Sequence, residues 1–429
     1  MNFEPTLTFA QAQDQSDSLR EMRKEYLFPH QQGKPYIYLC GNSLGLQPKV
    51  ARKILGEQLD NWQNLAVEGW FEGDAPWMYY HKALKKLMAP LVGALPAEVC
   101  PMNTLTVNLH LLLVSFYRPE GKRFKIIMEA GAFPSDQYAI ESQVRFHGYN
   151  PEEAIIEVAP EEGEYLLKTS AIVAAIEKNA ADTALVLFGG INYFTGQWFD
   201  MPAITTAGHQ AGAIVGFDLA HAAGNVPMNL HDWGVDFACW CSYKYQNAGP
   251  GGISGIFVHE RHFNRQMNRF AGWWGYQEST RFKMEKGFVP EAGADGWQVS
   301  CTQVMPMALY HASLHLFEKA GGITALRNKS KTLTSYLLFI INEVNKNLNQ
   351  EIFKVITPLS EAERGAQVSI IAKVNGKQIF DGLVANQVLG DWREPNVIRL
   401  SPVPMYNSYE DVYQTGQLLY QLAKQYDQL

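Results

Sequence analysis

The sequence predicts an α/β protein with a mostly parallel sheet in a large domain, followed by a smaller α+β domain. From about residue 125, short aliphatic runs alternate with segments of helical period, and 47% of the 429 residues are hydrophobic. Continuous apolar strands that alternate with helices are typical of a parallel sheet covered on both faces. The chain is also longer than most single domains, which favours two domains.

Six aliphatic runs are the expected strands of the large domain: residues 125–130, 154–159, 184–190, 213–218, 236–243 and 252–260. A Gly/Pro turn too short for a crossover helix joins the last two, so we expect that pair to be antiparallel. Amphipathic helices are expected before the sheet, over 48–62 and 79–93. Leu55, Leu59 and Trp62 fall on one face of the first.

After about residue 300 the pattern changes. Two long helical stretches within 304–349 precede strands at 366–374 and 396–403 and a final helix. We therefore divide the chain into an N-terminal arm or part of the small domain (1–47), a large domain (48–300) and a small domain (301–429).

Composition excludes several kinds of partner. The net charge is −7 with no basic block, so neither nucleic acid nor an anionic membrane is expected. No apolar run reaches the ~18 residues needed to cross a bilayer, and the N-terminus lacks the pattern of a secretory signal. The five cysteines are scattered without a C-x-x-C pair. That predicts reduced thiols in a cytoplasmic protein and no metal site.

Chemically useful residues follow the predicted strands. Asp218 and His221 follow one strand, Tyr243 and Lys244 end another, and Phe133 and Asp136 stand at a strand-to-helix turn, while Thr104, Leu105 and Thr106 begin a predicted helix. Ligands of parallel sheets bind beyond the carboxyl ends of the strands. A helix start suits a phosphate, a carboxylate suits a pyridinium and a lysine forms a Schiff base with an aldehyde. Together they describe pyridoxal phosphate.

Each residue alone has a plainer explanation. Asp218 could be a turn former, His221 a buried structural histidine, Thr106 a helix cap and Lys244 a solvated strand end. The "GPGG" segment at 249–252 precedes a strand, which favours a turn over a phosphate loop. The combination is what favours the cofactor.

Longer segments resemble the kynureninases, fold type I pyridoxal-phosphate enzymes related to the class V aminotransferases. They include "GFDLAHAAGN", "HDWGVDFACWCSYKY", "AFPSDQYAIESQ", "NTLTVNLH" and "STRFKM". The resemblance extends from "YLCGNSLGLQP" to "SPVPMYNSYEDVY". It implies hydrolysis of L-kynurenine to anthranilate and L-alanine, a step of tryptophan catabolism and of NAD synthesis.

The resemblance also implies roles for single residues. Lys244 would form the Schiff base and act as the base, Asp218 would pair with the pyridine nitrogen, and Tyr243 would carry protons in later steps. The other implied cofactor contacts are Leu105, Thr106, Phe133, Pro134, Ser135, Asp136, His221, Trp273 and Cys301. Trp273 would reach the phosphate of a neighbouring subunit, which implies a homodimer with shared sites. Arg399, Trp70 and Thr302 would bind the substrate, with Arg399 as a carboxylate clamp.

The chain departs from the animal kynureninases at three places. Trp70 stands where they have a histidine, Cys301 follows Ser300 where they have Ser-Asn, and Gly189 replaces a small hydroxyl residue. Trp70 and Cys301 offer little to a substrate hydroxyl, so we expect L-kynurenine to be preferred over 3-hydroxykynurenine. The plainer alternative is that Trp70 only packs the core.

Three other functions stay open at this point. One is a transaminase on the same scaffold, and another is a cysteine desulfurase with Cys301 as nucleophile. The third is a non-catalytic cofactor-binding regulator, which would usually carry a DNA-binding module that is not visible here.

Overall fold

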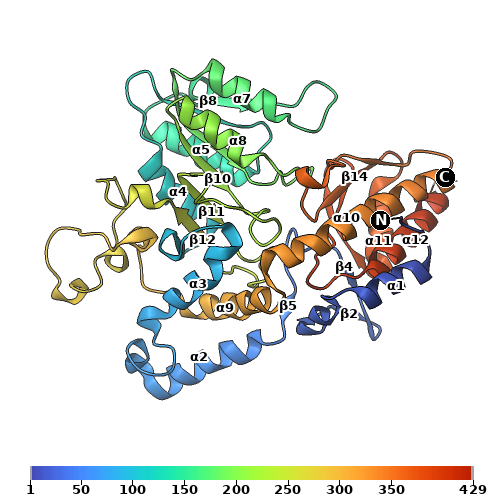
Figure 1. Cartoon of the computed structure of the whole chain (residues 1–429), viewed down its shortest axis with the longest axis horizontal. Coiled ribbons are helices and arrows are strands. Elements are labelled where there is room, and N and C mark those ends of the chain that lie inside the picture. Colours follow the sequence, from blue (N-terminus) through green and yellow to red (C-terminus); the bar gives the residue numbers. More distant parts are fainter. Residues whose placement is uncertain (1, 427–429) are drawn as a thin grey trace.

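The computed structural model describes residues 2–426 and contains a seven-stranded sheet with the order β6-β12-β11-β10-β9-β7-β8 (Figure 1). Strand β12 runs antiparallel to both of its neighbours, and the pairs from β11 to β8 are parallel. The six predicted strands and the antiparallel pair are therefore confirmed. Their bounds are β6 Val99–Pro101, β7 Lys125–Glu129, β8 Ile155–Val158, β9 Thr183–Gly189, β10 Ile214–Asp218, β11 Phe237–Trp240 and β12 Gly255–Val258.

Helices cover both faces of this sheet. Neighbouring residues of a strand point to opposite faces, so each strand contributes side chains to two cores. Ile127 and Phe217 belong to a core that includes α3 (Tyr80–Val92), α7 (Thr169–Lys178) and α8 (Met201–Gln210). Ile126 and Phe237 belong to the opposite core, with α4 (Leu105–Phe116) and α5 (Pro134–Phe146). The continuous apolar strands of the sequence are thus explained by burial on both faces.

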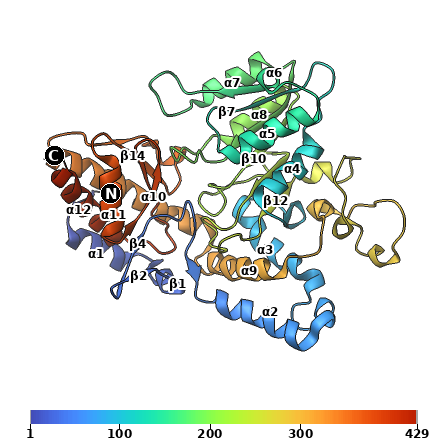
Figure 2. The ribbon, with the colours of Figure 1, turned by 180° about the vertical axis from the view of Figure 1, so that it is seen from behind.

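The small domain has an antiparallel sheet of order β13-β14-β17-β16, which lies beside the large domain in Figure 2. The N-terminal helix α1 (Leu7–Ser16) packs against α12, and β4 (Ile37–Tyr38) pairs with β15 (Val388–Leu389). The N-terminal segment therefore contacts the end of the chain. The domain's other elements are α10 Gly322–Asn347, α11 Gly376–Ala385, α12 Tyr409–Tyr426, β13 Phe353–Val355, β14 Val368–Ala372, β16 Asp391–Arg393 and β17 Val397–Leu400.

Helices α2 (Ala51–Leu65) and α9 (Val304–Lys319) pack against each other below the large sheet in Figure 1. Helix α9 shares the core of α3, although it follows residue 300, where we expect the large domain to end. On α2 the predicted apolar face is largely uncovered, since Leu59 is 47% and Trp62 61% exposed.

Shorter elements complete the described chain: β1 Tyr26–Leu27 with β5 Gln47–Pro48, β2 His30–Gln31 with β3 Lys34–Pro35, and α6 Pro151–Ala154. Among the described residues, no helix has the length and apolar character needed to cross a membrane.

Candidate active site

Lys244 lies in a loop four residues beyond β11, which corrects the expectation that it ends the strand. Strand β11 ends at Trp240 because the chain then turns, and the Ser242 carbonyl accepts a hydrogen bond from the Ala248 N–H at 3.0 Å. The loop aims the amine of Lys244 at His221, with 3.1 Å between Nζ and Nε2. The same nitrogen lies 5.7 Å from the centre of the Phe133 ring. The lysine is therefore held among polar and aromatic groups.

His221 is a neutral acceptor for this amine. Burial, and then the positive charge of Lys244, hold the pKa of His221 well below its usual value. An imidazole that accepts at Nε2 carries its proton on Nδ1. That Nδ1 is buried and has no hydrogen-bond partner among the described residues. The site thus presents an unused donor.

Asp218 and Asp136 form a buried carboxyl pair. Asp218 ends β10 and accepts from the Ala220 N–H at 2.7 Å, and Asp136 lies in the first turn of α5. Burial, and then the negative charge of Asp218, raise the pKa of Asp136 well above its usual value. Burial also raises the pKa of Asp218, while the hydrogen bond from Asp136 lowers it. Two buried carboxyl groups of like charge favour a cationic group beside them.

The start of α4 brings backbone N–H groups to the same cavity. Thr104 precedes the helix in extended conformation, and its side chain makes no capping hydrogen bond. The N–H groups of the first helical turn are therefore not capped by Thr104. Leu105 and Thr106 line the cavity, as does Ser135 of α5. The cavity is also lined by Phe133, Asp136, Asp218, His221, Tyr243 and Lys244. Most residues predicted from the sequence are therefore together, and Pro134 opens α5 beside them.

Sequence reasoning missed Glu129, which ends β7 and lines the cavity. Its carboxyl accepts from the Gly189 N–H at 3.1 Å and from Asn192 Nδ2 at 2.7 Å, and burial raises its pKa to about 7. A Cβ on residue 189 would lie 2.7 Å from Glu129 Oε1, which explains the glycine at this place. The one available signal was a glutamate at the end of a buried strand.

Arg399 of β17 approaches the cavity from the small domain. Its side chain is 1% exposed, and its Nη1 donates to the carbonyl of Tyr193, a lining residue, at 2.6 Å. Its Nη2 contacts Asp391 in an ion pair and donates to Ser43 Oγ at 3.2 Å. Its Nε–H is buried without an acceptor among the described residues. Arg399 itself does not line the cavity and is connected to it through Tyr193.

Trp70, Trp273, Cys301 and Thr302 do not line the Lys244 cavity of their own chain. Trp70 packs against Trp274, with 5.5 Å between ring centres. Trp273 is 45% exposed, Cys301 is exposed, and the buried Thr302 hydroxyl has no partner within residues 2–426.

Comparison with known proteins agrees with this geometry. Residues 326–419 match the family model for the kynureninase C-terminal domain. The kynureninase of Flavobacterium psychrophilum is 54% identical over 420 residues, which is 98% of each chain. That of Myxococcus xanthus is 49% identical over 96% of each chain. Among solved structures, the apo cysteine desulfurase of Thermococcus onnurineus NA1 superposes with a TM-score of 0.73. It is 17% identical and covers 91% of this chain and 95% of that one.

A mostly parallel sheet, a lysine in the loop beyond it and a carboxylate at a strand end define a fold type I pyridoxal-phosphate enzyme. Within that class, the chain is about 50% identical to the two kynureninases over nearly its full length. It belongs to the kynureninase family.

Proposed function

We propose that the chain hydrolyses the Cβ–Cγ bond of L-kynurenine, giving anthranilate and L-alanine, with pyridoxal phosphate as cofactor. One observation carries the site assignment: the Lys244 amine lies against neutral His221, in the same cavity as the buried Asp218–Asp136 pair. The family of the chain supplies the reaction.

The residues present fit the cofactor. Asp218 would hold the ring nitrogen as a cation. That positive charge would offset the repulsion between the carboxylates of Asp218 and Asp136. The first turn of α4 and Ser135 would bind the phosphate, Phe133 would cover the ring, and the unused Nδ1–H of His221 offers a further donor. When bound, the cofactor supplies an electron sink that stabilises carbanions.

The chain's own groups then handle the substrate and its protons. Arg399 would bind the α-carboxylate through its unpaired Nε–H, while Nη1 and Nη2 contact Tyr193, Ser43 and Asp391. Lys244 removes the proton from Cα, because its amine lines the cavity beside the groups that would hold the cofactor. Tyr243 stays a neutral phenol, since burial raises its pKa, and it can return a proton to the leaving alanyl carbon.

We also propose that two copies share their sites. The uncovered α2 face and the exposed Trp273 support this assembly, because large apolar side chains outside the core mark contact surfaces. Trp273, Cys301, Trp70 and Thr302 would then complete the site of the other copy. Light scattering of the purified protein tests the stoichiometry, and a monomer with full activity would contradict shared sites.

Turnover distinguishes the remaining functions. Incubation with L-kynurenine should release fluorescent anthranilate together with alanine in equal amounts. Keto-acid formation would select a transaminase instead, sulfide release from cysteine would select a desulfurase, and no product would select a binding protein. We place the enzyme in the cytoplasm, where its five unpaired cysteines stay reduced. Its role is in tryptophan catabolism or in nicotinamide-cofactor synthesis.

A further inference from the structure

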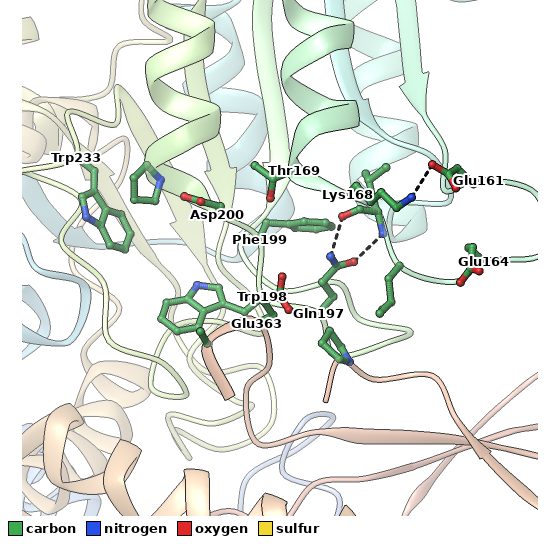
Figure 3. A pocket seen from close by; sticks show the side chains of 15 residues that line it. Glu161, Glu164, Lys168, Thr169, Gln197, Trp198, Phe199, Asp200, Trp233 and Glu363 are labelled. Carbon is green, nitrogen blue, oxygen red and sulfur yellow. Dashed lines mark hydrogen bonds and ion pairs between the residues drawn. The ribbon is translucent and has the colours of Figure 1, made fainter. Parts of the chain in front are cut away.

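A second and larger cavity, which we call the acidic cleft, lies between the two domains. Its volume is about 630 Å³, within the range of small-molecule sites. It is lined by the segment before α7, by the end of the loop between β9 and α8, and by residues 358–363 of the small domain. Figure 3 shows the side chains that surround it.

Negative charges outnumber positive ones in the lining of the acidic cleft, and the Arg327 guanidinium lies 5.5 Å from the centre of the Trp198 ring. Four carboxylates line it, those of Glu161, Glu164, Asp200 and Glu363, against the single amine of Lys168. That amine is already paired with Glu161 at 2.7 Å. Within the described residues, none of the other three carboxylates forms an ion pair. The cleft therefore attracts cations and repels the carboxylates of kynurenine and anthranilate.

The apolar part of the lining is aromatic. The indoles of Trp198 and Trp233 are half-buried, and in Figure 3 they lie on the same side of the cleft as Asp200. The opposite side is closed by Gln197, whose amide exchanges hydrogen bonds with the Leu167 backbone at 2.8 and 2.9 Å. The ring of an aromatic ligand can stack on an indole, and the neighbouring carboxylates attract a positive charge attached to that ring.

We propose that the acidic cleft binds an aromatic ammonium ion, with its charge toward Asp200 and Glu363 and its ring toward Trp198 and Trp233. The assignment goes beyond the proposed catalytic function and does not depend on it. The ligand is an amine without a carboxylate, which distinguishes it from the substrate.

The cleft is connected to the active site through one loop. The backbone N–H of Trp198 donates a hydrogen bond to the backbone carbonyl of Glu363 at 2.8 Å. This bond joins the two domains. Earlier in the same loop, Tyr193 lines the Lys244 cavity and its carbonyl binds Arg399. A ligand that contacts both Trp198 and Glu363 restrains this junction, so it should change the binding affinity for the substrate. By reciprocity, the substrate should change the affinity of the cleft by the same factor.

The test is calorimetric titration of the holoenzyme with benzyltrimethylammonium, which cannot form an imine with a cofactor aldehyde. We expect one site per chain, and we expect Asp200→Asn with Glu363→Gln to weaken binding roughly tenfold or more. Asparagine caps helices as aspartate does, so the N-terminus of α8 should stay folded in the Asp200→Asn variant. Glu177→Gln on the exposed face of α7 is the matched control and should bind normally.

Three results would overturn the proposal. One is the absence of binding at millimolar concentrations. Another is binding that the double variant leaves unchanged, which would place the cation elsewhere. The third is equally tight binding of neutral benzyl alcohol, which would show that the carboxylates play no part. Since the readout is heat of binding, none of these results depends on turnover of kynurenine.

Discussion

The two cavities on either side of the β9–α8 loop both contain carboxylates, but burial gives those carboxylates different chemistry. In the Lys244 cavity, burial raises the pKa of Asp136, Asp218 and Glu129, which favours their neutral forms or a cation beside them. In the acidic cleft, Asp200 and Glu363 are exposed to water and remain charges that a cation can approach. A carboxylate can therefore either hold a cofactor group or attract a cationic ligand, depending on how well water solvates it.

The largest effect should come from Lys244→Ala. Loss of the amine removes both the cofactor anchor and the base, so we expect kcat to fall by roughly 10⁴-fold or more. Anthranilate fluorescence measures it, with Lys178→Ala on the surface of α7 as control. Binding of benzyltrimethylammonium to the cleft should be retained, which separates the two cavities. Near-normal turnover in Lys244→Ala would rule out this assignment.

Asp218→Asn should rank second. An amide cannot hold the ring nitrogen as a cation, so we expect kcat to fall by about a hundredfold or more and the cofactor to dissociate more readily. Stopped-flow kinetics and cofactor titration measure both effects, with the exposed Asp232→Asn as control. Unchanged kcat would mean that Asp218 serves only the turn at the end of β10.

Arg399→Lys should weaken substrate binding and leave cofactor binding unchanged. A lysine cannot reproduce the planar contacts to the Tyr193 carbonyl and to a carboxylate, so KM should rise roughly 30-fold. The absorbance of the resting holoenzyme should stay normal. If the spectrum changes while KM does not, Arg399 supports the fold instead of binding the substrate.

The smallest effect concerns substrate preference. The parent enzyme should favour L-kynurenine over 3-hydroxykynurenine, and Trp70→His with Cys301→Asn should shift the kcat/KM ratio by up to about tenfold toward the hydroxylated substrate. Both residues lie outside their own chain's cavity, so the shift would also support a shared site. A parent that already prefers 3-hydroxykynurenine would contradict this interpretation.

Strand ends were the most predictable part of the site. Asp218, His221 and Phe133 could be located from the sequence because parallel strands end at one edge. Lys244 was expected on the strand, yet it lies in a loop held by hydrogen bonds that no periodicity records. Glu129 ends an apolar strand as Asp218 does, but it was missed because the expected cofactor needed only one strand-end carboxylate. Strand β6 was missed because three residues carry too little pattern.

The contacts between domains were beyond the sequence for a different reason. Arg399 meets Tyr193 across 206 positions of the chain, and the acidic cleft joins segments about as far apart. Such contacts depend on how the two domains pack, which local patterns do not encode. The same would hold for Trp70 and Trp273 in the shared site that we propose, since their partners there belong to a second chain.

The account rests on Lys244 as the residue that anchors the cofactor, and reductive trapping tests it directly. The holoenzyme would be treated with borohydride, digested and analysed by mass spectrometry, with untreated enzyme as control. We predict a phosphopyridoxyl group on the peptide that contains Lys244 and on no other lysine peptide. A trapped cofactor on a different lysine, or an unmodified Lys244 peptide in fully reduced enzyme, would contradict the assignment.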